Sequence, residues 1–290
     1  MSTFKNNNFV RIILVLVLLV GASLPQVYAD TFDSDGVEIF YTIEGQGEPV
    51  ILVHGFAATG ASNWRQPGII AGLATQYQVI TLDNRGHGAS GKPHDVVQYG
   101  EQMVKDVINL MDHLDIERAR IAGYSMGGMI TQKLITMYPE RVVKAVSGGF
   151  GWGGNQEGGG LELMNVLAES LESGNGIGPL LIALTPAGQP QPTPEALAQI
   201  NAMFMSTNDH LALAATVRSF TTLNVSQEEL NANKVPLMYM VGDIDPLKAD
   251  VDRARGVAGN AEFVVVPGNH MTAFTQPVFL ENLQRFFAAQ

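Results

Sequence analysis

The chain of 290 residues contains no cysteine, which excludes disulfide bonds, a thiol nucleophile and a thiolate metal site. Basic residues are also scarce: 17 lysines and arginines stand against 28 aspartates and glutamates, which gives a formal net charge of −11. A surface of this sign repels nucleic acid and anionic lipid. The fold therefore has to rest on its apolar core alone, and no nucleic-acid partner is expected.

An apolar run lies near the N-terminus. Lys5 and Arg11 precede the uninterrupted run Ile12 to Val20, and the tripeptide "VYA" follows as a small-residue cleavage site. This pattern predicts a secretory signal peptide over residues 1–29, cut after Ala29. An uncleaved membrane anchor is the alternative, but the run is shorter than the roughly 20 apolar residues of a spanning helix. We expect a periplasmic or secreted protein with a mature charge of −13 and no stable membrane association.

Short apolar runs recur after the leader, each ending in glycine, aspartate or a polar turn. The segment "TFDSDGVEIFYTIEG" predicts two strands around an Asp35-Gly36 turn. Continuous apolar runs suit strands covered on both faces, as in a parallel sheet, and helical patterns such as "GEQMVKDVINLMDHL" alternate with them. This alternation predicts a doubly wound α/β fold. The runs are Pro49 to Gly55, Gln78 to Asp83, Arg120 to Ser125, Val142 to Gly149, Pro236 to Asp243 and Ala261 to Gly268.

The alternation stops over residues 148–233. A glycine-rich stretch, "GGFGWGGNQEGGG", opens this region, and helical segments such as "ELMNVLAESLES" and "PEALAQINAMFMS" follow. A helical excursion between two sheet strands predicts a lid over the strand ends, with the glycines as its hinge. A phosphate-binding loop is disfavoured because no Lys-Ser or Lys-Thr follows. The expected core thus comprises residues 30–147 and 234–290. Candidate apolar walls in the lid are Met164, Leu167, Leu171, Leu180, Leu181, Met203, Phe204, Met205 and Phe220.

Ser125 lies in "GYSMG", which fits the pattern G-x-S-x-G with a strand before it and a helix after it. The flanking glycines allow a tight turn that brings the strand and the helix close together. The helix N-terminus, with its positive dipole end, points at the serine and favours an oxyanion there. This context predicts a nucleophile rather than an ordinary turn residue, provided that a base can take the hydroxyl proton.

Six histidines could supply that base. His270 follows the last apolar strand in "VVVPGNHMTAF", where the carboxyl ends of strands meet in an open α/β sheet. His94, His113 and His210 fall in a polar loop, on the exposed side of a helix and in the lid, where solvated side chains are expected. His270 is therefore the favoured base. The imidazole also needs a carboxylate that fixes its tautomer, and the spacing leaves both Asp243 and Asp245 open.

Five segments occur in the order found in the α/β-hydrolase superfamily, which the chain resembles from about Val37 to its end: "LVHGF", "LDNRGHGAS", "GYSMGG", "VGDIDP" and "PGNHMTAFTQP". The resemblance implies a mostly parallel eight-stranded sheet with helices on both faces and the lid inserted after the sixth strand. It also implies a triad of Ser125, Asp245 and His270, because the acid in such relatives is the Asp before Pro.

The resemblance further implies an oxyanion hole built from the backbone N–H groups of Phe56 and Met126. His54 is expected to brace the loop that carries Phe56. The residues Asp83, Arg85 and His87 are expected to form a structural network; a metal site from His54, Asp83 and His87 is the alternative. No cofactor and no metal are expected.

A serine nucleophile suits acyl transfer through a covalent acyl-enzyme. It argues against the haloalkane dehalogenases and epoxide hydrolases of the superfamily, which use a carboxylate. The leading interpretation is a hydrolase of small carboxylic esters. The alternatives are a lactonase or carbon–carbon bond hydrolase with the same triad, a cofactor-free perhydrolase, and a non-catalytic binding protein on a hydrolase scaffold.

Overall fold

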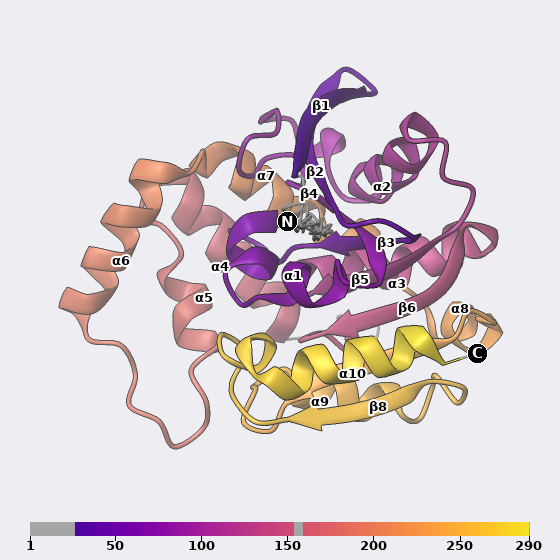
Figure 1. The fold of residues 1–290 in the computed structure, drawn as a ribbon. Coiled ribbons are helices and arrows are strands. Elements are labelled where there is room, and N and C mark those ends of the chain that lie inside the picture. The colour runs from indigo at the N-terminus through magenta and orange to yellow at the C-terminus, as the bar shows by residue number, and fades with distance from the viewer. Residues whose placement is uncertain (1–26, 154–158, 290) are drawn as a thin grey trace, which may run out of the picture.

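The computed structural model describes residues 27–153 and 159–289, and these residues form one eight-stranded sheet with the strand order β1-β2-β4-β3-β5-β6-β7-β8 (Figure 1). Strands β1 (Tyr28–Ser34) and β2 (Val37–Glu44) form the expected hairpin at Asp35-Gly36, where both residues have positive φ angles of 53° and 83°. Strand β2 is antiparallel to β4, and the remaining neighbours are parallel. The predicted mostly parallel sheet is confirmed.

The six parallel strands coincide with the apolar runs of the sequence. Their side chains alternate between two buried faces: Ile51 and Val53 belong to one apolar cluster, whereas Val50 and Leu52 belong to the other. Burial on both faces explains why most of these strands read as continuous rather than alternating apolar runs; the last strand lies at the edge of the sheet, where Val265 is 44% exposed. The strands are β3 (Glu48–Val53), β4 (Tyr77–Leu82), β5 (Ala119–Tyr124), β6 (Val142–Gly148), β7 (Leu237–Gly242) and β8 (Glu262–Val266).

Helices cover both faces of the sheet. Buried side chains of α2 (Glu101–His113), α3 (Met126–Met137) and α9 (Lys248–Ala254) join the cluster of Ile51, and those of α1 (Ile69–Leu73) and α10 (Pro277–Ala288) join the cluster of Val50. Short helical turns complete the connections at η1 (Ala61–Arg65), η2 (Val96–Gln98), η3 (Pro139–Arg141), η4 (Phe220–Leu223) and η5 (Ala273–Thr275).

The chain between β6 and β7 is helical, as the sequence predicts. Helices α5 and α6, with the long loop that joins them, stand out from the side of the sheet (Figure 1). Leu167, Leu171 and Phe204 are buried, whereas Met203 is 67% exposed and does not belong to the core of this segment. The helices of this segment are α4 (Gly159–Glu172), α5 (Gly178–Ala183), α6 (Pro194–Thr207), α7 (His210–Ser219) and α8 (Gln227–Ala232).

Two of the sequence-based expectations fall on residues outside those described. The predicted signal peptide lies there over residues 1–26, and part of the predicted glycine hinge lies there over residues 154–158. Tyr28 and Ala29, the last two residues of the predicted leader, are exposed in β1 and pair with Ile43 and Thr42. Within the described ranges, no helix is long and apolar enough to cross a bilayer.

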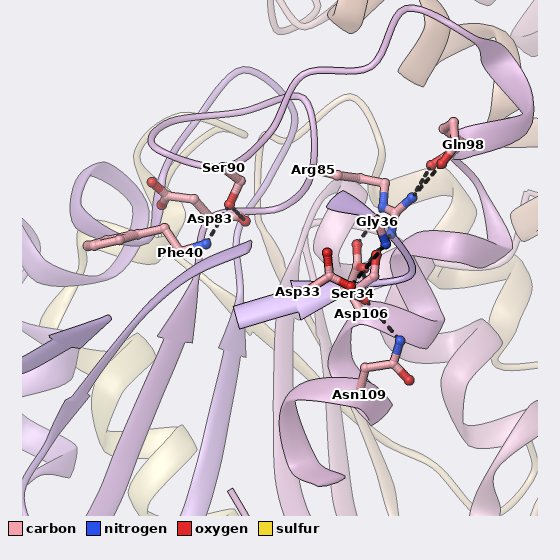
Figure 2. A network of polar contacts seen from close by, with 10 residues as sticks. All are labelled: Asp33, Ser34, Gly36, Phe40, Asp83, Arg85, Ser90, Gln98, Asp106 and Asn109. Carbon is pink, nitrogen blue, oxygen red and sulfur yellow. Dashed lines mark hydrogen bonds and ion pairs between the residues drawn. The ribbon is translucent and has the colours of Figure 1, made fainter. Parts of the chain in front are cut away.

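A buried ion pair fastens the loop after β4 to helix α2 (Figure 2). Arg85 donates from Nε and Nη2 to the two carboxylate oxygens of Asp106 at 2.7 and 2.6 Å, and both side chains are almost fully buried. Ser34 of β1 donates to the same carboxylate at 2.6 Å, and Asn109 donates to Ser34 Oγ at 2.9 Å. Removing one partner of such a pair typically costs about 3–5 kcal/mol because the other charge is left buried. This network holds the first hairpin and the β4 loop in register.

Candidate active site

Ser125 occupies the one-residue turn between strand β5 and helix α3. Its φ and ψ angles are 54° and −114°, a conformation that costs a non-glycine residue about 1–3 kcal/mol. Two backbone hydrogen bonds hold it there: the Ser125 N–H donates to Gly148 O at 2.7 Å, and the Ser125 carbonyl accepts from Met129 N–H at 3.1 Å. The side chain is therefore presented at the carboxyl edge of the sheet, directly beside the start of α3.

The glycines on either side of Ser125 are required by close backbone contacts. A Cβ on Gly123 would lie 1.9 Å from Gly127 O, and a Cβ on Gly127 would lie 2.0 Å from Val53 O. These distances are far below van der Waals contact, so any side chain would push α3 away from the sheet. The packing reason that the sequence pattern suggested for the two glycines is confirmed.

The structure brings Ser125, His270 and Asp245 together from three separate loops. His270 Nε2 lies 3.0 Å from Ser125 Oγ, and His270 Nδ1 lies 2.9 Å from Asp245 Oδ2. Asp245 follows β7 and His270 follows β8, so both side chains reach the serine from neighbouring strand ends. The His270 and Asp245 side chains are only 5% and 0% exposed, which shields their hydrogen bond from water.

The structure distinguishes the two aspartates that the spacing left open. Asp245 directs one carboxylate oxygen at His270, and its other oxygen accepts from Leu247 N–H at 2.9 Å. Asp243 is exposed and accepts instead from Gly268 N–H at 2.8 Å. Asp243 thus ties the loop after β7 to the loop after β8, whereas Asp245 is the partner of the imidazole.

Tyr124 is a site residue that the sequence reasoning missed. Its hydroxyl donates to the backbone carbonyl of His270 at 2.7 Å, and its ring lies 5.4 Å from the imidazole between centroids. Burial raises the pKa of the Tyr124 phenol well above its ordinary value, so the hydroxyl stays protonated and keeps donating. Only the tertiary fold brings Tyr124 to His270, which is why no local sequence pattern announces this contact.

The predicted oxyanion donors flank the nucleophile. Met126 is the first residue of α3, and the first N–H groups of a helix have no intrahelical acceptor. Phe56 follows Gly55, where an added Cβ would lie 3.3 Å from Ser125 Cβ, so this loop passes directly beside the serine. The Phe56 ring meets Phe220 of η4 edge to face, with 6.0 Å between centroids. The helical segment thus contacts the loop that carries this N–H group.

His54 braces that loop and is not free to bind a metal. Its Nδ1 lies 2.8 Å from Gly55 O, and its Nε2 accepts from Asn84 N–H at 2.8 Å, so the ring is neutral with its proton on Nδ1. Burial lowers the pKa of His54 to about 4 and that of His87 to about 3. Within the described part of the chain, no three His, Cys, Asp or Glu side chains are grouped as metal ligands.

The structural network expected after β4 is present. Asp83 accepts from Gly60 N–H and Ala89 N–H, both at 2.9 Å, and His87 Nδ1 donates to Arg85 O at 3.0 Å. The other histidines pair elsewhere: His94 with Asp209, His113 with Tyr41 and His210 with Leu171 O. His270 is thus the histidine that the fold places against Ser125.

Comparison with known proteins agrees with this architecture. A family profile described as the alpha/beta hydrolase fold matches residues 48–150. A Synechocystis protein provisionally named as a non-heme chloroperoxidase is 37% identical over 124 residues, which is 42% of this chain and 44% of that protein. The 3-oxoadipate enol-lactonase 2 of Acinetobacter baylyi is 38% identical over 115 residues, which is 39% of this chain and 42% of that enzyme.

A solved structure extends the likeness to most of the fold. The enol-lactonase from Burkholderia xenovorans superposes with a TM-score of 0.73 at 21% identity, covering 90% of this chain and 100% of that one. The two curated relatives are matched over less than half of their own length. Strand order, the family profile over residues 48–150 and the superposed structure together show that the chain has the α/β-hydrolase fold.

The two buried neutral histidines predict acid lability of the fold. In the unfolded chain His54 and His87 bind protons near pH 6.5, but folded they do so only near pH 4 and 3, so the unfolded state binds more protons in between. The contribution of the two histidines to the free energy of unfolding is therefore at its maximum above about pH 6.5 and falls as the pH drops. Urea titrations should show a loss of roughly 2–4 kcal/mol between pH 7 and pH 5, at about 1.4 kcal/mol per proton and pH unit.

The variant His87→Gln is the control for this dependence. It removes one of the two protons, so the free energy of unfolding should fall less steeply with acidification, whatever the absolute stability of the variant. A free energy of unfolding that does not change between pH 7 and pH 5, or an unchanged slope in the variant, would contradict the assignment of neutral buried imidazoles.

Proposed function

We propose that this protein is a serine hydrolase that cleaves carboxylic esters of small molecules through an acyl-enzyme. The observation that carries the proposal is the hydrogen-bonded chain from Ser125 Oγ through His270 to Asp245, with distances of 3.0 and 2.9 Å. A protein that only binds a ligand has no need for a strained serine backed by a buried imidazole and carboxylate.

Acylation begins at the serine oxygen. Ser125 Oγ attacks the ester carbonyl carbon while His270 Nε2 takes the hydroxyl proton, and Asp245 stabilises the resulting imidazolium and holds its tautomer. The carbonyl electrons move onto the oxygen, which becomes an oxyanion within reach of the N–H groups of Phe56 and Met126. One such donor typically contributes about 10²- to 10³-fold to the rate.

Collapse of the tetrahedral intermediate completes the first half of the reaction. The bond between the carbonyl carbon and the alcohol oxygen breaks, and His270 gives its proton to the departing alkoxide. Water then takes the place of the alcohol: His270 removes a proton from it, the water oxygen attacks the acyl carbon, and the carboxylic acid leaves as Ser125 regains its proton.

A lactone is the second candidate substrate. The observation that favours it is that enol-lactonases occur both among the sequence relatives and among the similar structures. A lactone is an internal ester, so the same groups act on it, and its alcohol remains attached to the acyl chain. The two candidate substrates therefore require pockets of different shape, but they react by the same chemistry.

The helical segment between β6 and β7 and the N-terminal leader complete the proposal. The segment acts as a lid, supported by the contact of Phe220 with Phe56 beside the nucleophile.

The leader directs export to the periplasm or the medium, supported by the basic residues and apolar run of residues 1–29. N-terminal sequencing of exported protein should begin at Asp30; a start at Met1 in a membrane fraction would favour an anchor.

Covalent labelling tests the nucleophile. A fluorophosphonate probe should label the wild-type protein and fail to label Ser125→Ala, because only an activated serine attacks the phosphorus. Ser62→Ala removes a half-buried hydroxyl in η1 that bonds, among the described residues, to Thr59 alone, so it serves as the control and should label like wild type. A wild-type protein that the probe does not label would refute Ser125 as the nucleophile. If the wild-type protein is labelled, a panel of p-nitrophenyl esters and lactones would rank its substrates.

Two neighbouring substitutions test the acid. Asp245→Asn should lower kcat by roughly 10⁴-fold, because an amide can hold the imidazole in the wrong tautomer. Asp243→Asn keeps an acceptor for Gly268 N–H and should leave kcat close to the wild-type value. Ester or lactone turnover by both purified variants decides the point, and the reverse pattern would move the acid to Asp243.

A further inference from the structure

The Phe56 N–H group belongs to a peptide whose orientation is fixed from its carbonyl side. Gly55 O, in the same peptide plane, accepts from His54 Nδ1 at 2.8 Å and from Ala58 N–H at 3.3 Å. In a trans peptide the N–H points away from the C=O. Whatever holds the Gly55 carbonyl therefore also directs the Phe56 N–H.

The preceding peptide is held at both of its ends by asparagine side chains. The Gly55 N–H donates to Asn63 Oδ1 at 2.8 Å, and Asn84 Nδ2 donates to His54 O at 3.2 Å. An N–H can only donate and a carbonyl can only accept, so the orientation of both amides follows. Asn63 comes from η1 and Asn84 from the loop after β4, and the two are 4% and 0% exposed.

Asn84 makes a second contact with the same loop. Its backbone N–H donates to His54 Nε2 at 2.8 Å, which sets the tautomer in which Nδ1 donates to Gly55 O. One residue thus orients both the His54 ring and the His54 carbonyl. Because Gly55 has no Cβ to restrict its backbone, the direction of the Phe56 N–H depends on these hydrogen bonds.

Both asparagines are kept at a cost. Asn63 Nδ2 and Asn84 Oδ1 are buried and have no hydrogen-bond partner among the described residues. A buried polar atom without a partner typically costs about 1–3 kcal/mol. An apolar residue of similar size would avoid this cost, so the single hydrogen bond that each amide makes to the His54–Gly55 peptide accounts for an asparagine at each place.

We propose that Asn63 and Asn84 are positioning residues that aim the Phe56 N–H at the developing oxyanion by holding the His54–Gly55 peptide from opposite sides. The inference rests on the hydrolysis proposed above. A purely structural role would affect the stability of the fold alone. In the proposed role, both side chains contribute to the stabilisation of the tetrahedral intermediate and do not affect substrate binding.

The test compares Asn63→Leu and Asn84→Leu with wild type on the best p-nitrophenyl ester or lactone. A misdirected donor should lower kcat by about 10- to 100-fold with KM nearly unchanged, which is less than the full loss of a donor. Affinity for an aryl boronic acid, which forms a tetrahedral adduct on the serine, should fall by the same factor. Asn63→Ala and Asn84→Ala replace any leucine variant that does not fold, as judged by circular dichroism.

Asn109→Leu is the matched control, because Asn109 also bridges two elements through its amide but lies on α2 and donates to Ser34. It should keep wild-type kcat and boronic acid affinity even where urea titration shows lower stability. Variants of Asn63 and Asn84 that lose stability but keep kcat and boronic acid affinity would overturn the inference and leave the proposed function intact. A wild-type protein that neither turns over an ester or lactone nor binds the boronic acid would overturn the proposed function itself.

Discussion

The site depends on one backbone constraint, the left-handed turn at Ser125. A strand that runs directly into a helix has to reverse within one residue, and this residue has a φ of 54°. The turn is possible because Gly123 and Gly127 have no Cβ; an added Cβ would lie only 1.9 and 2.0 Å from the nearest carbonyl oxygens. Its consequence is that the serine hydroxyl, the start of α3 and the loop after β3 all meet at one point.

The other groups reach this point because the parallel strands end at the same edge of the sheet. Asp245 and His270 follow adjacent strands; the bond from Gly268 N–H to Asp243 joins the loops that carry them, and the Tyr124 hydroxyl ties His270 O to the end of β5. The loop of Phe56 is fastened from the opposite side by Asn63 and Asn84. Rigid attachment of each loop suits a site whose donors have to be in place before charge develops.

Much of the fold could be predicted from the sequence, because each strand is a continuous apolar run bounded by turn residues and the serine lies in a pattern with strict packing demands. The choice between Asp243 and Asp245 could not be made from spacing, since both follow β7 and only side-chain direction separates them. Tyr124, Asn63, Asn84 and the Arg85–Asp106 pair act through contacts between segments distant in sequence, and local patterns do not record such contacts. The exposure of Met203 could not be predicted, because apolar character on a helix does not reveal whether a neighbour covers the side chain.

Ser125 is proposed to attack a carbonyl whose oxygen is received by the N–H groups of Phe56 and Met126. A crystal structure of the protein after reaction with a phosphonate ester would test this most directly, because the adduct imitates the tetrahedral intermediate. We expect phosphorus bonded to Ser125 Oγ and the phosphonyl oxygen within hydrogen-bond distance of both N–H groups. Phosphorus on another residue, or a phosphonyl oxygen directed away from Phe56 and Met126, would contradict it.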